Sequence, residues 1–417
     1  MTPLLLSHTD ASDGAARAAY RLHRALIRAG LASRLKVRNK ISDDWTVAGP
    51  SNKVGRVSSR LRPALGSLLM RIQETENMNY HSGNWLPSAM ANVVNASFAD
   101  VVNMHWVGGE TLSLRDIGRI RKPLVWTLHD MWAFCGAEHY TADDATARWR
   151  NGYSKANRPI AQRGPDIDRL VWLRKHRAWR RPMHIVTPSH WLAHCVRTSE
   201  LMRDWPLTVI PNVLDTGAYQ PLNRGFCRQA LGLPGERKII VFGAVGGARD
   251  RRKGHDLLVG ALERLATMVD AQDVLCVVFG QSMPQNPPKF LFPTRWMGHI
   301  HDDATLALLY NAADVTVVPS RQENLPQAAT EAQACGCPVV AFDCTGLPDA
   351  VVHRETGYLA SAFDTADMAE GLRWILEDAG LRVALGRAAR ARALRLWAPE
   401  VIIPQYLRVY ESAIISH

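Results

Sequence analysis

The stretch R-Q-E-N-L-P-Q-A-A-T-E, Arg321–Glu331, constrains the fold more than any other part of the chain. An apolar run, Asp314–Pro319, precedes it and predicts a buried parallel strand. The residues that follow, Gln327–Cys335, are rich in Ala, Gln and Glu and predict a helix. Glu323 is therefore expected at the carboxyl end of a strand, and Glu331 about two turns into the next helix. In open α/β sheets, ligands bind at that edge.

The start of this predicted helix is suited to binding an anion. The first amides of a helix have no partner within the helix and carry the positive end of its dipole. Two carboxylates on either side of such a site suit a ligand that has hydroxyl groups at both ends of a diphosphate. A nucleotide sugar has this chemistry.

A second motif, G-A-V-G-G-A-R-D-R-R-K-G, covers Gly243–Gly254 between a predicted strand and a predicted helix. Glycines after a strand let the backbone approach a phosphate, and Arg252 and Lys253 add positive charge. The spacing is not G-x-G-x-x-G, which argues against a dinucleotide oxidoreductase. A basic exposed turn is the alternative. Three arginines are close enough in sequence to reach a diphosphate: Arg249, Arg251 and Arg252. Of these, Arg252 is favoured.

Together these segments resemble the Glu-x7-Glu signature of retaining glycosyltransferases of the GT-B architecture (glycosyltransferase family 4-like, group 1). The segment G-C-P-V-V-A-F-D-C-T-G-L-P-D-A-V-V-H-R-E-T-G-Y-L, Gly336–Leu359, resembles that family's next strand, Gly-rich turn and helix. R-K-G, Arg252–Gly254, resembles its donor-diphosphate motif. The resemblance implies an α/β protein with two Rossmann-like domains facing each other across a cleft. Solvated carboxylates on an ordinary helix are the alternative for the two glutamates.

The resemblance also implies roles for individual residues. Glu331 would bind the ribose hydroxyls, and Glu323 would bind sugar hydroxyls without a demonstrated role as nucleophile. Arg252 and Lys253 would neutralise the departing diphosphate, and His129 would orient the sugar and help stabilise an oxocarbenium-like transition state. The remaining expected donor-binding residues are Gly14, Gly243, Asn324, Leu325, Pro326 and Gln327.

Two of these residues lie in the N-terminal half. Gly14 follows the first predicted strand, where relatives usually carry Gly-Gly and this chain has Asp13-Gly14; a plain helix start is the competing interpretation. His129 follows the predicted strand L-V-W-T-L, and T-L-H-D-M-W-A-F resembles a subgroup that builds bacterial exopolysaccharide and lipopolysaccharide. His105 also ends a predicted strand and either faces the acceptor or is structural.

No metal is expected. Many relatives in the subgroup carry clustered cysteines after H-Y, but this chain has none between Cys135 and Cys195. Asp166-Ile-Asp168 satisfies a D-x-D pattern, yet it follows no predicted strand and lies among arginines. The resemblance implies that cationic side chains and helix dipoles take the place of a divalent ion at the leaving diphosphate.

A chain of 417 residues is expected to form two or three domains. The turn-rich connector Pro211–Asp215 places a boundary near residue 212, and V-I-P-N-x-x-D at 209–215 resembles the family's interdomain linker. The predicted domains are 1–212 on the acceptor side and 213–395 on the donor side, with a last helix, 396–417, returning to the first. Trp397, Tyr406 and Tyr410 fit that helix. A polar segment between Met131 and Arg181 has little periodicity and is expected to be a functional loop or disordered.

The net charge of +11 lies in the N-terminal half. Residues 1–210 hold 30 Lys and Arg against 17 Asp and Glu, whereas residues 211–417 hold 20 against 22. A basic half attracts lipid phosphates or pyrophosphate; a merely solubilising surface is the alternative. Nucleic acid is not expected, because no recognition module is present. No secretory signal or membrane-spanning run is found, and all seven cysteines are expected to be reduced thiols. A cytoplasmic protein is expected, peripheral on the inner face of the membrane.

The sequence therefore predicts retaining transfer of a sugar from a nucleotide-diphosphate sugar to a saccharide or polyprenyl-linked acceptor in bacterial surface polysaccharide synthesis. Two other classes stay open. One is a GT-B epimerase or hydrolase of nucleotide sugars, which the two donor motifs together disfavour. The other is a non-catalytic, basic, membrane-associated binding protein.

Overall fold

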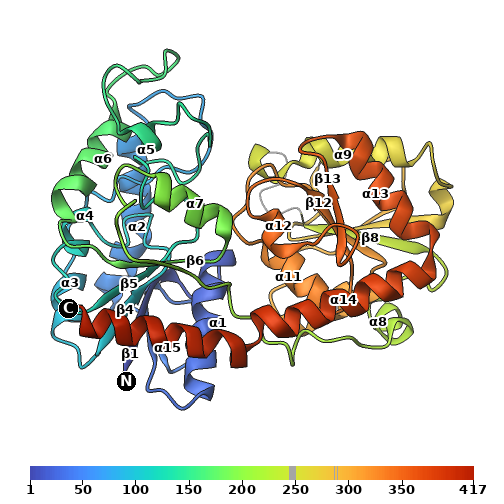
Figure 1. The fold of residues 1–417 in the computed structure, drawn as a ribbon, viewed down its shortest axis with the longest axis horizontal. Helices are drawn as coiled ribbons and strands as arrows, with labels where there is room; N and C mark the ends of the chain where they lie inside the picture. Colours follow the sequence, from blue (N-terminus) through green and yellow to red (C-terminus); the bar gives the residue numbers. More distant parts are fainter. Residues whose placement is uncertain (244–249, 286, 289) are drawn as a thin grey trace. The chain divides into compact units, whose positions relative to one another are not determined.

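The computed structural model describes residues 1–243, 250–285, 287–288 and 290–417. The chain forms two compact units: Met1–Val213 with Ile402–His417, and Leu214–Val401. Each unit is built on a parallel sheet with helices on both faces (Figure 1). The predicted α/β class with two Rossmann-like domains is confirmed at this level.

The N-terminal unit has a seven-stranded sheet in the order β3-β2-β1-β4-β5-β6-β7, and every pairing is parallel. Its strands are β1 (Pro3–Thr9), β2 (Arg34–Asn39), β3 (Val47–Ala48), β4 (Val101–Met104), β5 (Leu124–Thr127), β6 (His184–Thr187) and β7 (Leu207–Val209). Its helices are α1 (Gly14–Arg28), α2 (Lys53–Met70), α3 (Met90–Asn95), α4 (Leu114–Ile117), α5 (Arg148–Asn151), α6 (Ile167–Ala178), α7 (His190–Thr198) and α15 (Pro399–Ile415).

The C-terminal unit has a six-stranded parallel sheet in the order β10-β9-β8-β11-β12-β13. Its strands are β8 (Lys238–Gly243), β9 (Val274–Phe279), β10 (Thr294–Trp296), β11 (Val315–Val318), β12 (Val339–Phe342) and β13 (Gly357–Ala360). Its helices are α8 (Arg224–Ala230), α9 (His255–Leu265), α10 (Asp303–Ala312), α11 (Gln327–Ala334), α12 (Leu347–Ala350), α13 (Thr365–Glu377) and α14 (Ala379–Trp397), with 3-10 turns η2 (Arg251–Lys253) and η3 (Ala271–Asp273).

Successive strand residues of the N-terminal sheet alternate between two apolar layers, as the pleat requires. Leu5, Val101 and Val125 pack with α1 and α15 on one face. Leu4 and Val102 contribute to the layer on the opposite face. Both faces are covered, which explains why these strands read as continuous apolar runs.

The last helix is shorter than predicted. It begins at Pro399, because Trp397 ends α14 and its indole is buried in the core of the C-terminal unit. Tyr406 and Tyr410 belong to α15 and to the N-terminal core. The Tyr410 hydroxyl accepts a hydrogen bond from Asn103 Nδ2 at 2.9 Å, and the Tyr406 hydroxyl lies 3.2 Å from Thr127 Oγ1, so α15 is bonded to β4 and β5.

The segment between Met131 and Arg181 is largely irregular up to α6, as its low periodicity predicted, but it is packed into the core and is not disordered. It contributes a large share of the second apolar layer of the N-terminal unit, including five large side chains that are buried there: Trp132, Phe134, Trp149, Tyr153 and Trp172. Lys175 is buried among them and donates to the carbonyls of Trp132, Cys135 and Gly136. Burial lowers the pKa of this amine to about 7. The carbonyl oxygens satisfy its donors inside the core.

Candidate functional site

The two predicted donor motifs meet at the carboxyl edge of the C-terminal sheet. Glu323 lies in the loop from β11 to α11, and Arg252 and Lys253 form η2 between β8 and α9. Because β8 and β11 are adjacent and parallel, the loops that leave them emerge at the same edge. Lys253 and Glu323 are 70 residues apart in the sequence, and their side chains are in direct contact.

Glu323 is the centre of this cluster. Its Oε1 atom pairs with Lys253 Nζ, lies 3.3 Å from Arg252 Nη1 and accepts from Ser320 Oγ at 3.2 Å. Burial alone would raise the pKa of Glu323, but the charges of Lys253 and Arg252, with the hydrogen bonds from Lys253 and Ser320, outweigh it. The pKa is therefore lower than usual, and the carboxylate is ionised at neutral pH.

A close backbone contact brings the cationic turn to the carboxylate. Gly254 has φ +65°, and a Cβ atom there would lie 1.9 Å from the carbonyl oxygen of Pro319. Only glycine allows this approach at this φ. The Arg321 amide donates to the Arg252 carbonyl at 2.7 Å, and the Arg252 guanidinium donates to the Gln322 carbonyl at 3.0 Å. The two loops are thus held together by backbone as well as by charge.

A third loop, after β12, supports Glu323 in a way that the motif analysis missed. Thr345 Oγ1 accepts a hydrogen bond from the Glu323 amide at 3.1 Å, and the Gly346 amide donates to the Glu323 carbonyl at 2.9 Å. A Cβ atom on Gly346 would lie 1.5 Å from the Asn324 carbonyl oxygen. The T-G-L-P-D segment carried the family resemblance, but its position beside Glu323 depends on the β11–β12 pairing.

Glu331 lies on α11 with only 3% of its surface exposed, and its Oε2 accepts a hydrogen bond from the Tyr310 hydroxyl at 3.1 Å. Tyr310 belongs to α10 and was not singled out in the sequence. Helix α11 begins after Pro326, which as its N-cap residue makes no side-chain capping hydrogen bond. Gln327 is the first residue of α11 and so lies at the helix N-terminus where the sequence predicts an anion site.

The other predicted donor-binding residues have different environments. Asn324 and Leu325 are buried in the loop before α11. Gly243 ends β8, where a Cβ atom would lie 3.3 Å from the Phe279 ring. Residues 244–249, which include the rest of the glycine-rich motif and Arg249, lie outside the described residues. Among the described arginines of this motif, Arg252 is the one placed against Glu323.

In the N-terminal unit, His129 lies just beyond β5 and is stacked on His105, which follows β4. His105 Nδ1 and His129 Nε2 are 3.0 Å apart, so one ring donates a hydrogen bond to the other. Burial lowers the pKa of His129 to about 4, and burial also lowers that of His105. Both rings are therefore neutral at pH 7. His105 acts as a neighbour that fixes the His129 ring.

A second hydrogen-bond network lies next to this pair. Asp130 Oδ2 accepts from Trp106 Nε1 at 2.8 Å and pairs with His139 Nδ1 at 2.6 Å. His139 Nε2 lies 2.8 Å from Ser82 Oγ. Trp106 and His139 were not singled out in the sequence, and only the H-D pair after a strand indicated a site here. These groups fix the loop that carries His129.

Gly14 is the first residue of α1, and Asp13 is its N-cap, with Asp13 Oδ1 accepting from the Ala16 amide at 3.0 Å. The competing interpretation of this segment as a helix start thus describes the local structure. The charge of Asp13 also acts on His129 and His8, because it opposes the lowering of both pKa values. The start of α1 therefore lies close to the histidines at the carboxyl ends of β1 and β5.

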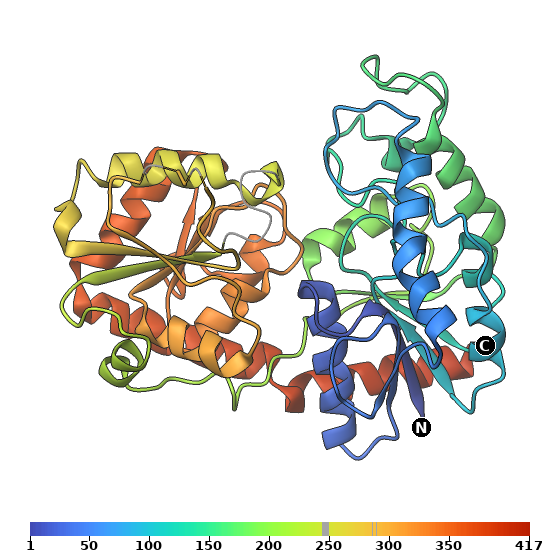
Figure 2. The ribbon, with the colours of Figure 1, turned by 180° about the vertical axis from the view of Figure 1, so that it is seen from behind.

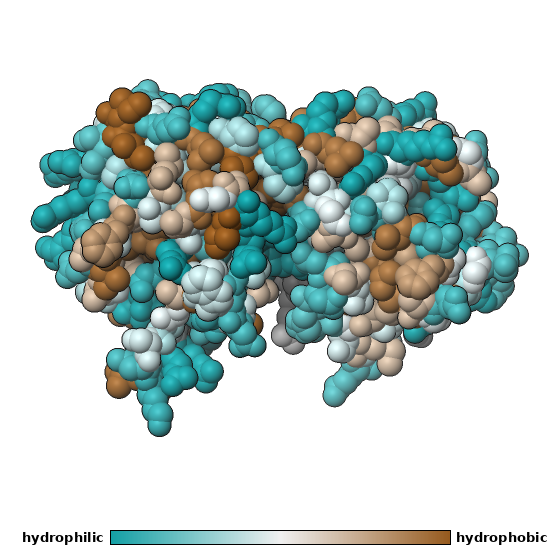
Figure 3. Space-filling model, turned by 90° about the horizontal axis from the view of Figure 1, so that it is seen from below, coloured by the Kyte–Doolittle hydropathy of each residue, from teal (hydrophilic) through white to brown (hydrophobic). Residues whose placement is uncertain are grey.

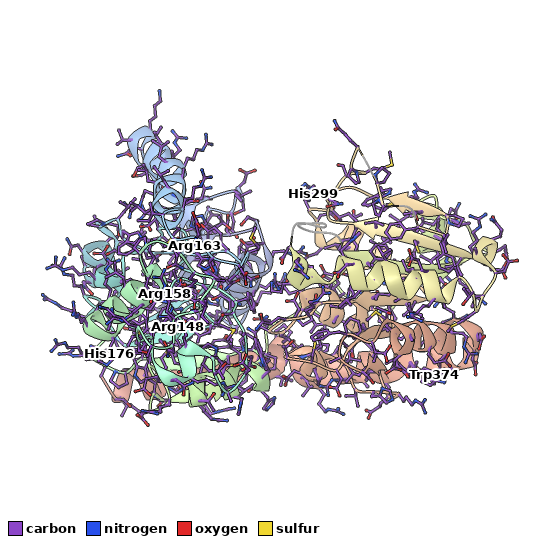
Figure 4. All side chains as sticks on the ribbon, turned by 90° about the horizontal axis from the view of Figure 1, so that it is seen from above. Arg148, Arg158, Arg163, His176, His299 and Trp374 are labelled. Carbon is purple, nitrogen blue, oxygen red and sulfur yellow. The ribbon has the colours of Figure 1, made fainter. Side chains whose placement is uncertain are left out.

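The two aspartates of the D-x-D pattern have protein partners. Asp166 caps α6, and its carboxylate accepts hydrogen bonds from both Nη atoms of Arg148, at 3.1 and 2.7 Å. Asp168 accepts from Gln73 and Gln162. Figure 4 labels Arg148 together with Arg158 and Arg163 in this part of the N-terminal unit. Within the described residues, no group of three or more His, Cys, Asp or Glu side chains is arranged to hold a metal ion.

Comparison with known proteins identifies the family. A family model described as glycosyl transferases group 1 matches residues 223–392, a range that contains both donor motifs. The D-inositol 3-phosphate glycosyltransferase of Saccharomonospora viridis is 34% identical over 320 residues, covering 72% of this chain and 67% of that protein. The chain belongs to the group 1 glycosyltransferases.

Other relatives agree with this assignment. The glycosyltransferase is 26% identical over 400 residues to the D-inositol 3-phosphate glycosyltransferase of Pseudarthrobacter chlorophenolicus, covering 89% of this chain and 80% of that protein. The match to the corresponding protein of Actinosynnema mirum, 34% identical over 198 residues, covers 44% of this chain and 47% of that protein. An enzyme of the transferase class, as predicted, is confirmed.

The fold of this glycosyltransferase is shared with solved GT-B structures. Sucrose-phosphate synthase from Thermosynechococcus elongatus superposes with a TM-score of 0.68 at 18% identity, with 100% of both chains covered. Anabaena HepE in complex with UDP and glucose gives 0.63 at 16% identity, with 99% of this chain and 100% of that chain covered. These similarities establish the architecture.

Two further properties of the chain bear on the predictions. All seven cysteines of the glycosyltransferase are described, and each is a free thiol, as predicted. In the described part of the chain, no helix is long and apolar enough to cross a membrane.

We expect the glycosyltransferase to lose stability as pH falls below 6.5. Burial lowers the pKa of His23, like that of His129, from 6.5 to about 4. Unfolded histidines take up protons below 6.5 while these two stay neutral in the fold, so the free energy of unfolding decreases through this window and is unaffected above it. The slope is about 1.4 kcal/mol per pH unit for each such histidine.

Urea unfolding across this pH window checks the prediction. His23 has both ring nitrogens bonded, to Ser33 and Thr46 hydroxyls at 2.9 and 2.8 Å. The variant His23→Asn should show a shallower pH slope than the wild type, whereas His194→Asn, at an exposed histidine, should not. Equal slopes in all three proteins would contradict the assignment.

Proposed function

We propose that this glycosyltransferase transfers a sugar, with retention of configuration, from a nucleotide-diphosphate sugar that is bound mainly by the C-terminal unit. The observation that carries the proposal is the contact of Lys253 and Arg252 with the ionised Glu323, in the loop that leads into α11. Two cations, a carboxylate and helix-start amides at one sheet edge match the charge and hydroxyl pattern of such a donor.

Each group would act on a different part of the donor. The diphosphate would compete with Glu323 for Lys253 and Arg252 and would bind the amides at Gln327, which stabilises the leaving charge without a metal. Freed from part of its ion pairing, the Glu323 carboxylate would accept hydrogen bonds from sugar hydroxyls. Glu331, held by Tyr310, would accept from the ribose. No divalent ion is required in this scheme.

His129 is proposed to orient the transferred sugar. Because its Nε2 atom bonds to His105, its Nδ1 atom is the one left to face a ligand. A neutral imidazole can donate or accept there without introducing a charge that would oppose an oxocarbenium-like transition state. Exclusion of water around the bound donor would limit its hydrolysis.

The acceptor is proposed to be a saccharide or a polyprenyl-linked saccharide at the cytoplasmic face of the membrane, in synthesis of surface polysaccharide. The structural neighbour WaaG is described as a glycosyltransferase involved in lipopolysaccharide biosynthesis. A second candidate is a phosphorylated polyol, because several relatives are named D-inositol 3-phosphate glycosyltransferase. The basic N-terminal half suits a phosphate on either acceptor.

Product analysis with labelled UDP-, GDP-, ADP- and dTDP-sugars tests this proposal. Each donor is incubated with the enzyme alone, with a bacterial lipid extract and with inositol 3-phosphate. Label that moves to one acceptor, with the anomeric configuration of the donor by NMR, is the expected result. Nucleotide release without any acceptor product would favour a hydrolase, an isomerised donor would favour an epimerase, and an inverted product would refute retention.

A further inference from the structure

An ordinary surface helix buries its apolar face, but helix α2 of the N-terminal unit exposes its apolar face to solvent. The residues that it buries are Ser59 and Gly66, whereas its leucines and valines face solvent. A helix of 18 residues that turns small and polar side chains inward has another use for its apolar face.

Specific contacts fix the inward face. Arg62 donates to the carbonyls of Glu110 at 3.1 Å and Pro87 at 2.9 Å, and also to that of Leu86. A Cβ atom on Gly66 would lie 2.5 Å from Glu110 Cγ. Rotating α2 to bury its leucines would break these bonds and place larger side chains against Glu110. The exposed orientation is therefore a property of the fold.

The outward face is a continuous apolar stripe. Six residues spaced by three or four positions, five on α2 and the last in the turn that follows it, are each more than half exposed, and we call them the α2 stripe: Val54, Val57, Leu61, Leu65, Leu68 and Ile72. In Figure 2 the blue helix α2 lies on the near side of the N-terminal unit, with no other helix over it. Figure 3 shows the molecule from below, a view in which brown apolar residues lie among teal polar ones. A stripe of this length on one helix marks an interaction surface.

Every charged residue in the segment that carries the stripe, residues 45–73, is basic. Between Asp44 and Glu74 the chain has no acidic residue, but it has five basic ones: Lys53, Arg56, Arg60, Arg62 and Arg71. Lys53, Arg60 and Arg71 are exposed and fall along one flank of the stripe at helical spacing. An apolar face flanked by lysine and arginine is the pattern of helices that lie in the interface of an anionic bilayer.

We propose that α2 is a membrane-docking helix, with the α2 stripe placed among the acyl chains and its basic flank against anionic headgroups. A second copy of this chain is a poorer occupant. A two-fold contact through the stripe would bring the same basic residues of both copies together, and residues 45–73 offer no acid to neutralise them. An anionic lipid surface satisfies both the apolar and the charged part.

This inference deepens the membrane location proposed above, and its test needs neither donor nor turnover. The purified protein is floated with phosphatidylcholine vesicles that contain or lack phosphatidylglycerol, and its mass is measured by light scattering. We expect flotation with the anionic vesicles and a monomer without them. Failure to float would overturn the membrane docking of α2 without affecting the proposed donor chemistry. Absence of donor transfer by a protein that floats would overturn the donor chemistry without affecting the docking of α2.

Two variants localise the effect. Leu61→Ser/Leu65→Ser/Leu68→Ser removes the centre of the stripe, and Phe98→Ser/Ile160→Ser removes two fully exposed apolar residues elsewhere in the same unit. All these side chains are exposed, so circular dichroism melts should match the wild type. We expect the first variant to lose about tenfold or more of its vesicle affinity and the second to keep it. Equal flotation of both, or a wild-type dimer that the first variant dissociates, would overturn the proposal.

Discussion

Lys253→Ala should lower the turnover of this glycosyltransferase by about a hundredfold or more, since a cation at the leaving diphosphate acts mainly in the transition state. The Lys253 side chain is 36% exposed, so the fold does not depend on its burial. Glu323 keeps Arg252 at 3.3 Å and the Ser320 hydroxyl at 3.2 Å in the variant. We therefore expect a loss of stability below about 2 kcal/mol.

The neighbouring variant Arg251→Ala is the matched control. Arg251 belongs to the same 3-10 turn and its side chain is exposed, whereas Arg252 and Lys253 make the contacts with Glu323. Initial rates and urea unfolding of the three proteins are compared. Turnover in Lys253→Ala equal to that in Arg251→Ala would remove Lys253 from the reaction.

Of the glycine-to-alanine substitutions at the site, Gly346→Ala should lower the stability of the protein most. The added Cβ would lie 1.5 Å from the Asn324 carbonyl oxygen and 2.9 Å from that of Glu323. Both obstacles are backbone, so no side-chain rotation relieves the overlap. The β11–α11 loop must move, and we expect a cost of at least about 3 kcal/mol, together with loss of donor binding.

Gly235→Ala is the control for this experiment, because a Cβ atom there meets no atom within 4 Å. Thermal and urea unfolding should place this variant within about 0.5 kcal/mol of the wild type. A Gly346→Ala protein as stable as Gly235→Ala would show that the loop after β12 does not press on the Glu323 loop.

The donor side of the site could be predicted from sequence because its parts obey local rules. Apolar runs mark β8 and β11, and a loop after each strand carries the polar residues. Parallel neighbouring strands then bring Lys253 and Glu323 to one edge, whatever their separation along the chain. The site assignments themselves remain predictions until the variants are measured.

The support of that site could not be predicted in the same way. Thr345 and Tyr310 contact the two glutamates through tertiary packing, and neither stands in a pattern that names its partner. The core formed by the segment between Met131 and Arg181 was missed for a related reason. Its buried tryptophans follow no helical or strand period, because long-range contacts between irregular segments position them.

Helix α2 shows a different limit of pattern analysis. The α2 stripe has the spacing that normally indicates a buried helix face. The structure turns it outward because Gly66 and Arg62 fit against the Glu110 loop and larger apolar side chains do not. Sequence periodicity reports that a face is apolar; the tertiary contacts decide whether protein or another surface covers it.

Calorimetric titration of UDP, GDP, ADP and dTDP into the wild type, Lys253→Ala and Arg251→Ala tests the central claim most directly, because it measures the diphosphate site without acceptor or turnover. The account predicts saturable binding of one nucleotide to the wild type, weakened about tenfold or more in Lys253→Ala, which is about 1.4 kcal/mol, and little changed in Arg251→Ala. Binding that is equally tight in all three proteins would contradict the placement of the donor diphosphate at Lys253.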